Sequence, residues 1–178
     1  MKTAFFTFGK FSPPTLGHKL MIEKMLEEAG NSDVYVVTSE SVRGENAPIN
    51  VKQKVDILKK MFKGTKVKVT SAKSALEFIK NIENKYNRVN MIVGQNREKK
   101  FNWIRNYTPK YGKTTGVKRP PGAISASAVR KSAREGNINK MKTMLNNLNK
   151  KMINKIYRTI REATPTPKKR TAKRPRKS

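Results

Sequence analysis

The chain has 178 residues, of which 35% are hydrophobic, and its formal net charge is +29. This length predicts a single domain, and the absence of cysteine excludes disulfides, thiolate metal sites and a cysteine nucleophile. No apolar run is long enough for a transmembrane helix, and Gly9 and Lys10 interrupt the N-terminal apolar run too early for a signal peptide. We therefore expect an intracellular protein with no membrane partner.

The positive charge is unevenly distributed. Residues 1–98 hold 17 Lys/Arg and 10 Asp/Glu, whereas residues 99–178 hold 24 Lys/Arg and 2 Asp/Glu. A field of this sign attracts polyanions such as nucleic acids. Lysine and asparagine are also abundant throughout, as an AT-rich genome would produce. Composition alone leaves both explanations open.

Strands alternate with helices along the first two thirds of the chain. The pattern predicts strands at 4–8, 33–39, 66–70 and 89–93, a fifth strand near 114–117, and helices at 19–26, 51–62, 72–86 and 99–107. Residues 33–39 are nearly all apolar, which is typical of a covered parallel strand, and residues 66–70 alternate like a half-exposed or edge strand. We expect an α/β fold, a Rossmann-like doubly wound parallel sheet of about five strands with a C-terminal helical part.

The C-terminal third is predicted to be helical and then disordered. Ser125 or Ser127 begins a helix, and residues 137–161 form a further one with a methionine-rich apolar face. Beyond it, no apolar residue is larger than alanine or proline. We therefore expect one domain over residues 1–162 and a disordered basic tail over residues 163–178. The tail could bind nucleic acid or act as a nuclear-import signal.

The first predicted strand and helix are joined by Gly9-Lys10-Phe11-Ser12-Pro13-Pro14-Thr15-Leu16-Gly17-His18. A buried strand, a Gly/Pro turn and a helix N-terminus form the usual anion site of an α/β protein, because free backbone N–H groups and the helix dipole face the turn. Lys10, Thr15 and His18 add side-chain donors suited to a phosphate. His18 is the only histidine, so we expect no metal site in the protein.

This segment resembles the T/HxGH signature of the nucleotidylyltransferase superfamily, with Thr15 at the position where histidine is common. A second element resembles the helix N-terminus that binds phosphates in the same superfamily. It reads Ile124-Ser125-Ala126-Ser127-Ala128-Val129-Arg130. The two motifs lie about a hundred residues apart, and together they span most of residues 4–135. The resemblance is closest to adenylyltransferases of the nicotinamide-mononucleotide type.

The resemblance implies an enzyme, a nucleotidyltransferase that moves a nucleoside monophosphate onto a phosphorylated acceptor and releases pyrophosphate. AMP from ATP, carried with Mg²⁺, is the expected donor, and nicotinamide mononucleotide is the leading acceptor. The implied catalytic residues are His18, Thr15, Lys10 and Arg130. The implied nucleotide-binding residues are Gly9, Phe11, Gly17, Gly94, Asn96, Ile124, Ser125 and Ser127. Asn96 stands where relatives carry an acid, so its role transfers least directly.

Three alternatives remain open at this stage. A cytidylyltransferase would use CTP in place of ATP. The charge excess also suits a nucleic-acid-binding protein on a transferase fold. Trp103 and Phe101 are core residues in one interpretation, and acceptor-binding residues that stack on a ring in the other. The acceptor itself and the oligomeric state do not follow from the sequence.

Overall fold

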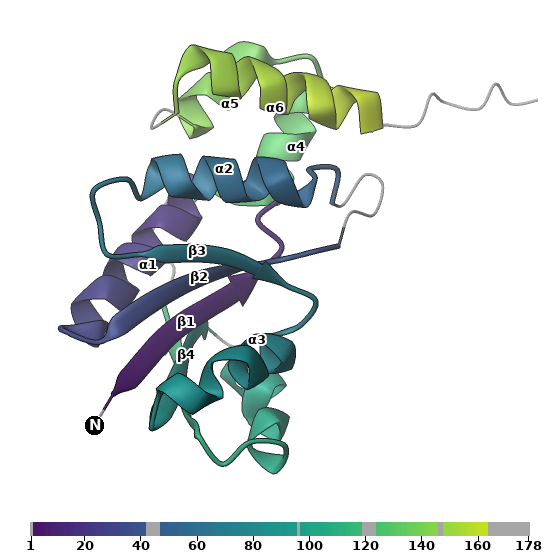
Figure 1. Ribbon diagram of the computed structural model, residues 1–178. Coiled ribbons are helices and arrows are strands. Elements are labelled where there is room, and N and C mark those ends of the chain that lie inside the picture. Colours follow the sequence, from purple (N-terminus) through teal and green to yellow (C-terminus); the bar gives the residue numbers. More distant parts are fainter. Residues whose placement is uncertain (1, 42–46, 96, 119–123, 146–147, 164–178) are drawn as a thin grey trace, which may run out of the picture.

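The computed structural model describes residues 2–41, 47–95, 97–118, 124–145 and 148–163. Five parallel strands form one sheet in the order β3-β2-β1-β4-β5 (Figure 1). Their bounds are Thr3–Gly9 (β1), Asp33–Ser39 (β2), Lys68–Ala72 (β3), Arg88–Gly94 (β4) and Tyr111–Val117 (β5). The predicted doubly wound α/β fold is confirmed, including the fifth strand and the edge position of β3.

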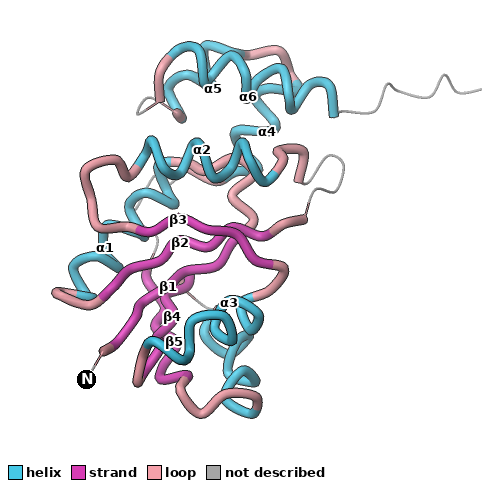
Figure 2. Tube along the Cα trace, viewed as in Figure 1, coloured by secondary structure: helices cyan, strands magenta, loops and turns pink. Residues whose placement is uncertain are grey.

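Helices cover both faces of the sheet (Figure 2). Helices α1 (Leu16–Ala29) and α2 (Val51–Met61) pack on one face. Helix α3 (Ala75–Ile82) and the 3₁₀ helix η3 (Glu98–Asn106) pack on the other, with the short 3₁₀ turn η2 (Glu83–Lys85) following α3. Neighbouring residues of β1 therefore enter different cores: Phe5 contacts the α1–α2 side and Phe6 the α3 side. Burial on both faces explains why β1 and β2 are almost wholly apolar.

The C-terminal helices pack on the outer side of α2. These are α4 (Ala126–Arg134), α5 (Ile138–Met144) and α6 (Lys150–Ala163) (Figure 1). Ile57 of α2 belongs to their apolar cluster, and the Gln53 amide donates to the Thr159 hydroxyl at 3.1 Å. Helix α2 thus lies between the sheet and the C-terminal helices. Its contacts with them fix the position of α4 relative to the sheet.

Several predicted bounds were wrong. The single helix expected over residues 137–161 is two helices, because asparagine side chains cap a new start: the Asn149 side chain accepts from the N–H of Met152. The helix predicted over residues 72–86 begins only after Ser74, which caps it, and Ala72 ends β3 instead. The helix predicted over residues 99–107 is of the 3₁₀ type.

The expected tail lies almost wholly outside the described residues, since the structure describes the chain only as far as Ala163 at this end. Among the described helices, none combines the length and the apolar character needed to span a bilayer.

Candidate functional site

A cleft of about 950 Å³ opens at the carboxyl ends of β1 and β4. These two strands are neighbours, and the chain leaves β1 toward β2 and β3 but leaves β4 toward β5. The cleft therefore lies at the switch point of the sheet, where α/β proteins bind their ligands. Gly9, Gly94, the start of α1 and the start of α4 all line it. Neither α1 nor α4 has an acidic residue in its first turn, so both positive helix ends face the cleft without an acid from their own helix.

The His18 ring is held by the residue that begins its own helix. The Thr15 backbone N–H donates to Nδ1 of His18 at 3.0 Å, and Phe11 packs edge-on to the imidazole at a centroid distance of 4.8 Å. An Nδ1 that accepts carries no proton, so the neutral ring carries its proton on Nε2. His18 lines the cleft. The tautomer of the His18 imidazole is thus fixed at the N-terminus of α1.

Phe11 holds the turn in an unusual conformation. Its φ is +46°, in the left-handed region that bulky residues rarely occupy, and its side chain is buried. A Cβ built on Gly9 would lie 3.2 Å from the Phe11 ring. Packing of the ring over Gly9 and against His18 holds this backbone, as expected where surroundings impose an uncommon φ.

The two motifs contact each other directly. The Thr15 hydroxyl donates to the Ile124 carbonyl oxygen at 2.8 Å, across 109 residues of sequence. A Cβ on Gly17 would lie 2.6 Å from that same carbonyl oxygen, a distance at which the backbone would have to move. Glycine is needed at position 17 because α1 and the segment before α4 approach so closely. The family resemblance implied a nucleotide-binding role for Gly17 but did not identify Ile124 as its neighbour.

Arg130 makes a second connection between the motifs. One guanidinium nitrogen donates to the Ser12 carbonyl oxygen at 2.8 Å, and another to the Ser127 hydroxyl at 3.2 Å. Burial and then the nearby charge of Arg134 lower the pKa of Arg130 from its ordinary value. Ser125 caps α4 by accepting from the Ala128 N–H. Side chains of Lys10, Ser127 and Arg130 line one cleft, so its surface is rich in donors for an anion.

The structure brings together most of the predicted site residues. The cleft is lined by Gly9, Lys10, Phe11, Thr15, Gly17, His18, Gly94, Phe101, Ile124, Ser125, Ser127 and Arg130. Asn96 lies outside the described residues. Trp103 is not among the lining residues; it is 46% exposed and packs edge-on against Tyr107, so its interpretation as a core residue is wrong. Phe101 packs partly against the α3-side core and also borders the cleft.

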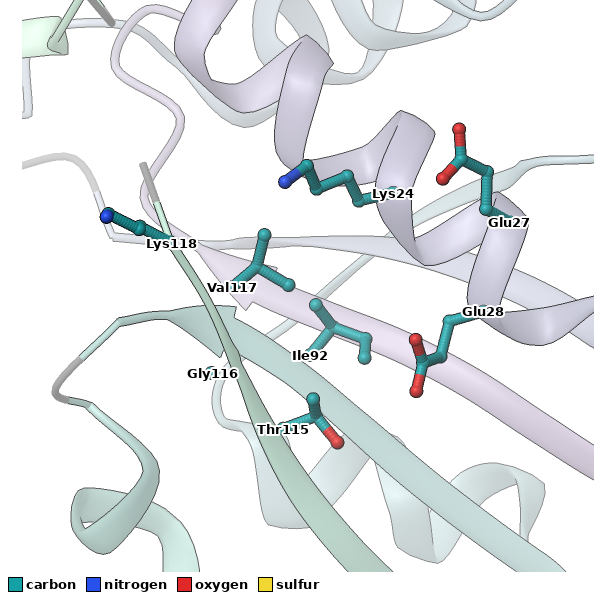
Figure 3. A pocket seen from close by; sticks show the side chains of 8 residues that line it. All are labelled: Lys24, Glu27, Glu28, Ile92, Thr115, Gly116, Val117 and Lys118. Carbon is teal, nitrogen blue, oxygen red and sulfur yellow. The ribbon is translucent and has the colours of Figure 1, made fainter. Parts of the chain in front are cut away.

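Sequence reasoning missed two lysines that border the cleft, Lys24 on α1 and Lys118 after β5. Both also line a second groove of about 430 Å³ between α1 and β5 (Figure 3). Because the two lysines line both hollows, the hollows adjoin. Ile92 and Val117 form its apolar floor, and Glu27 and Glu28 lie along α1 away from the main cleft (Figure 3). Gly17, Leu20 and Lys24 are separated by three and four residues, so helical spacing places them on the same side of α1. This spacing was the signal for Lys24 in the sequence.

A third missed residue, Lys54 of α2, is fully buried near the end of β2. Its ammonium group donates to the carbonyl oxygens of Ser39 and Ser41, at 3.1 and 3.2 Å. A signal for its burial was present in the sequence, because Lys54 falls on the apolar stripe that includes Val51, Val55 and Leu58.

The cleft lies at the switch point of an α/β sheet and is bordered by the N-termini of α1 and α4, an arrangement that suits anions. Residues 6–132 match the family model described as cytidylyltransferase-like, which covers most of the chain. The chain belongs to this cytidylyltransferase-like family. No curated protein sequence matches it.

Solved structures with the same fold include several nucleotide-binding proteins. A protein provisionally named a nicotinate-nucleotide adenylyltransferase, from Vibrio parahaemolyticus, is 17% identical, with a TM-score of 0.62 over 89% of this chain and 96% of that one. TmcAL of Thermotoga maritima, bound with alpha-thio ATP, is 14% identical, with a TM-score of 0.62 over 91% and 56%. A bifunctional NMN adenylyltransferase/ADP ribose pyrophosphatase of Francisella tularensis, complexed with AMP and a manganese ion, is 16% identical, with a TM-score of 0.62 over 91% and 52%. The present chain thus spans about half the length of the last two proteins, and at these identities the likeness concerns the fold.

Proposed function

We propose that the protein is a nucleotidylyltransferase that moves AMP from ATP onto a phosphorylated acceptor, with nicotinamide mononucleotide the leading acceptor. The observation that carries this proposal is the direct contact between the two motifs, through Thr15, Gly17 and Ile124. That contact places the N-termini of α1 and α4 on one cleft with His18 and Arg130. The family match, and similar folds that hold alpha-thio ATP or AMP, support a nucleotide substrate.

The reaction needs no protein nucleophile. An oxygen of the acceptor phosphate attacks the α-phosphorus of ATP, the bond from that phosphorus to the oxygen bridging to the β-phosphorus breaks, and pyrophosphate leaves with the electron pair. The protein contributes alignment and stabilisation of negative charge on the phosphates. In this proposal the Nε2–H of His18 holds an oxygen near the reacting phosphorus. Thr15 is buried and orients the ring, because its N–H donates to His18 and its hydroxyl to Ile124. Lys10, Ser127 and Arg130 hold the departing pyrophosphate.

Magnesium belongs to the substrate in this proposal. The described residues contain no cluster of three or more His, Asp or Glu side chains able to hold an ion. The donors around the cleft are instead cationic or neutral, which suits phosphate oxygens better than a cation. Mg²⁺ therefore arrives bound to the triphosphate, where it spreads the phosphate charge.

The decisive experiment is a matrix of nucleoside triphosphates against phosphorylated acceptors, read by pyrophosphate release. ATP with nicotinamide mononucleotide should give the fastest release, and nicotinate mononucleotide, phosphopantetheine and phosphocholine complete the acceptor set. Faster release with CTP would replace the adenylyl assignment by the cytidylyl alternative. Release from no pair, together with no binding of ATP or CTP, would overturn the proposed function.

One observation favours nucleic-acid binding as a second candidate function. Lys151, Lys155 and Arg158 are exposed on one side of α6, opposite the buried Ile153 and Ile156. The three described ion pairs all lie in the first half of the chain, so none of them neutralises this side of α6. A cationic helix face of this kind can contact successive phosphates. Exchanging all three residues for glutamine tests this candidate separately from catalysis.

A further inference from the structure

Among the residues that the structure describes, no acid forms an ion pair with the buried lysine of α2. Lys54 is 0% exposed, and none of the ion pairs among the described residues includes it. Its ammonium group donates to the Ser39 and Ser41 carbonyl oxygens, and more weakly to the Ser39 hydroxyl at 3.5 Å. These neutral oxygens satisfy its hydrogen bonds but leave a net positive charge in the interior. Burying an unpaired charge is costly unless a counter-ion is supplied.

The position of Lys54 indicates where that counter-ion would lie. Ser39 ends β2, directly beside the end of β1, where Gly9 pairs with Thr38. The next residue, Lys10, lines the cleft, and its backbone oxygen lies 3.5 Å from the Thr38 hydroxyl. Lys54 does not line the cleft; it is held at the end of β2, the strand beside the one that leads into Lys10.

The two lysines influence each other electrostatically. Burial, and then the charge of Lys10, lower the pKa of Lys54 to about 8. Other charged groups nearby are engaged elsewhere or exposed: the Glu40 carboxylate accepts from the Ser71 hydroxyl, and Asp56 is exposed on α2. The groups that face the Lys54 ammonium from β2 and the following segment are serines, which do not titrate in this range. Lys10, from the β1–α1 turn, is the one cation that acts on it among the described residues.

We propose that Lys54 is the buried half of an anion subsite at the end of β2, with Lys10 as its exposed half, and that an anion held by Lys10 keeps Lys54 protonated. Substrate binding is then coupled to proton uptake at a residue that never touches the substrate. The proposal rests on the proposed function only in taking a phosphate as the anion. Lys54 is thus a positioning residue with an electrostatic role, and its two carbonyl contacts hold it in place.

The coupling has a definite sign. An anion near Lys10 favours the charged form of Lys54, so binding raises the pKa of Lys54 above its value of about 8 in the free protein. Affinity for the anion is full below pH 7 and declines as pH rises through 8. A rise of one pKa unit corresponds to about a tenfold loss of affinity. Protons that the ligand itself exchanges are common to the wild type and to a variant that differs only at Lys54, so the difference in proton uptake between two such proteins reports on Lys54.

Isothermal titration calorimetry with pyrophosphate, and separately with ATP and Mg²⁺, tests the coupling. Titrations at pH 7.0, 8.5 and 9.5, in buffers of different ionisation enthalpy, measure both the dissociation constant and the protons taken up. We expect the wild-type protein to take up a substantial fraction of a proton at pH 8.5 and to bind about tenfold more weakly at pH 9.5 than at pH 7.0. Lys54→Arg, which stays charged at all three pH values, should bind without this uptake and with little dependence on pH.

Two further variants separate the electrostatic role from a structural one. Lys54→Met should bind more weakly at pH 7.0 and also lose the pH dependence, whereas Lys52→Met, an exposed lysine of the same helix, should behave like the wild type. The α-amino group, which also titrates near pH 8, is present in every variant. Circular dichroism and thermal unfolding establish that each variant is folded.

The outcomes distinguish this inference from the proposed function. Tight binding with the same proton uptake in wild type and Lys54→Arg would overturn the coupling and leave the nucleotidyl-transfer proposal standing. Binding with no uptake in the wild type would do the same. Binding of neither pyrophosphate nor ATP at pH 7.0 would overturn both.

Discussion

Gly17 is the residue where the two motifs come closest, so it gives the sharpest single-residue prediction. Gly17→Ala places a Cβ 2.6 Å from the Ile124 carbonyl oxygen, and one of the two backbones must shift. We expect affinity for ATP to fall at least tenfold, because the helix N-termini of α1 and α4 move apart. Glu23→Ala is the matched control, because Glu23 is exposed on the same helix and does not line the cleft. Equal ATP affinities of the two variants in calorimetry would contradict this prediction.

Replacing His18 tests the proposed chemistry of the site, whereas replacing Gly17 tests the packing of the two motifs. We expect His18→Ala to lower kcat by roughly 10²–10³-fold, the scale for losing one preorganised donor. Its ring contacts Phe11 and the Thr15 N–H, so removing it should cost little stability. Steady-state pyrophosphate release measures kcat, and thermal unfolding checks the fold. Activity within a few-fold of wild type would exclude His18 from the reaction.

At the scale of elements, Arg130 connects α4 to the β1–α1 turn. Arg130→Lys should lose most activity, because an ammonium group cannot donate both to the Ser12 carbonyl and toward Ser127 with the guanidinium geometry. Lys131→Ala, at the exposed neighbouring position, should leave kcat unchanged within a few-fold. Comparing the two variants under saturating ATP separates the role of Arg130 from the general charge of α4. A similar loss in both would mean that only the charge of the helix matters.

A partly buried polar network lies at the amino end of β2, away from the cleft at the carboxyl ends of the strands. Tyr86 donates to the Asp33 carboxylate at 2.6 Å, and its oxygen lies 2.7 Å from that of Tyr35. The hydrogen bond from Tyr86, followed by the charge of Lys68, lowers the pKa of Asp33 below its ordinary value. A lowered carboxylate pKa stabilises the fold above pH 4, and this stabilisation is lost as pH falls through the folded-state pKa.

Tyr86→Phe should therefore lower the free energy of unfolding at pH 7 by about 1–3 kcal/mol, the range for a hydrogen bond to a charged group. The deficit should be smaller at pH 2.5, because protonation of Asp33 removes the charge that strengthens the hydrogen bond. Urea unfolding at both pH values measures the difference. Tyr107→Phe, whose side chain is 60% exposed, is the control and should change stability little at either pH. A deficit independent of pH would place the effect in packing alone.

The elements were predictable wherever one physical signal dominated. The strands were recognisable because burial on both faces demands apolar residues, as in β2, and the turn after β1 because glycine and proline leave few backbone paths. The division between α5 and α6 was missed because the methionine-rich stripe continues in helical spacing past Leu145. Capping by Asn149 is a local interaction that this periodicity does not reveal.

The site was predictable only in part, for a physical reason. Local motifs identified Thr15, His18 and Arg130, since their chemistry is visible in a short stretch of sequence. The partners of these residues depend on tertiary packing: Ile124 for Gly17, Ser12 for Arg130, and Ser39 for Lys54. Trp103 was assigned by residue type alone, which does not distinguish a ring that faces solvent from one that borders a cleft.

At the scale of the whole molecule, the basic C-terminal tail can be tested separately from the candidate active site. Residues 168–178, outside the described part of the chain, hold seven Lys/Arg and no acid. We propose that residues 1–162 suffice for catalysis and that the tail binds polyanions. Deleting residues 165–178 should leave kcat unchanged and weaken binding to duplex DNA. The slope of log affinity against log salt should decrease in magnitude by up to about 6, the value for seven phosphate contacts.

The glutamine triple variant of Lys151, Lys155 and Arg158 is the companion to this truncation. If only the truncation weakens DNA binding, the tail is the binding surface. If only the triple variant weakens DNA binding, the outer side of α6 is the binding surface. Unchanged affinity and salt slope in both would remove nucleic-acid binding from either surface and favour compositional drift as the source of the charge.

The contact between Thr15 and Ile124 also determines when the site can form during folding. Strand β1 pairs with β4 more than eighty residues later, and the Thr15 hydroxyl bonds to a carbonyl 109 residues away. Closing such long loops is slow compared with forming local helices. On a ribosome, the site cannot assemble until the chain beyond Arg130 has emerged, by which time β1, α1 and β2 have long been available to pair. Nucleotide binding therefore reports the last stage of folding: after dilution from denaturant, the helical circular dichroism signal should return before the capacity to bind ATP.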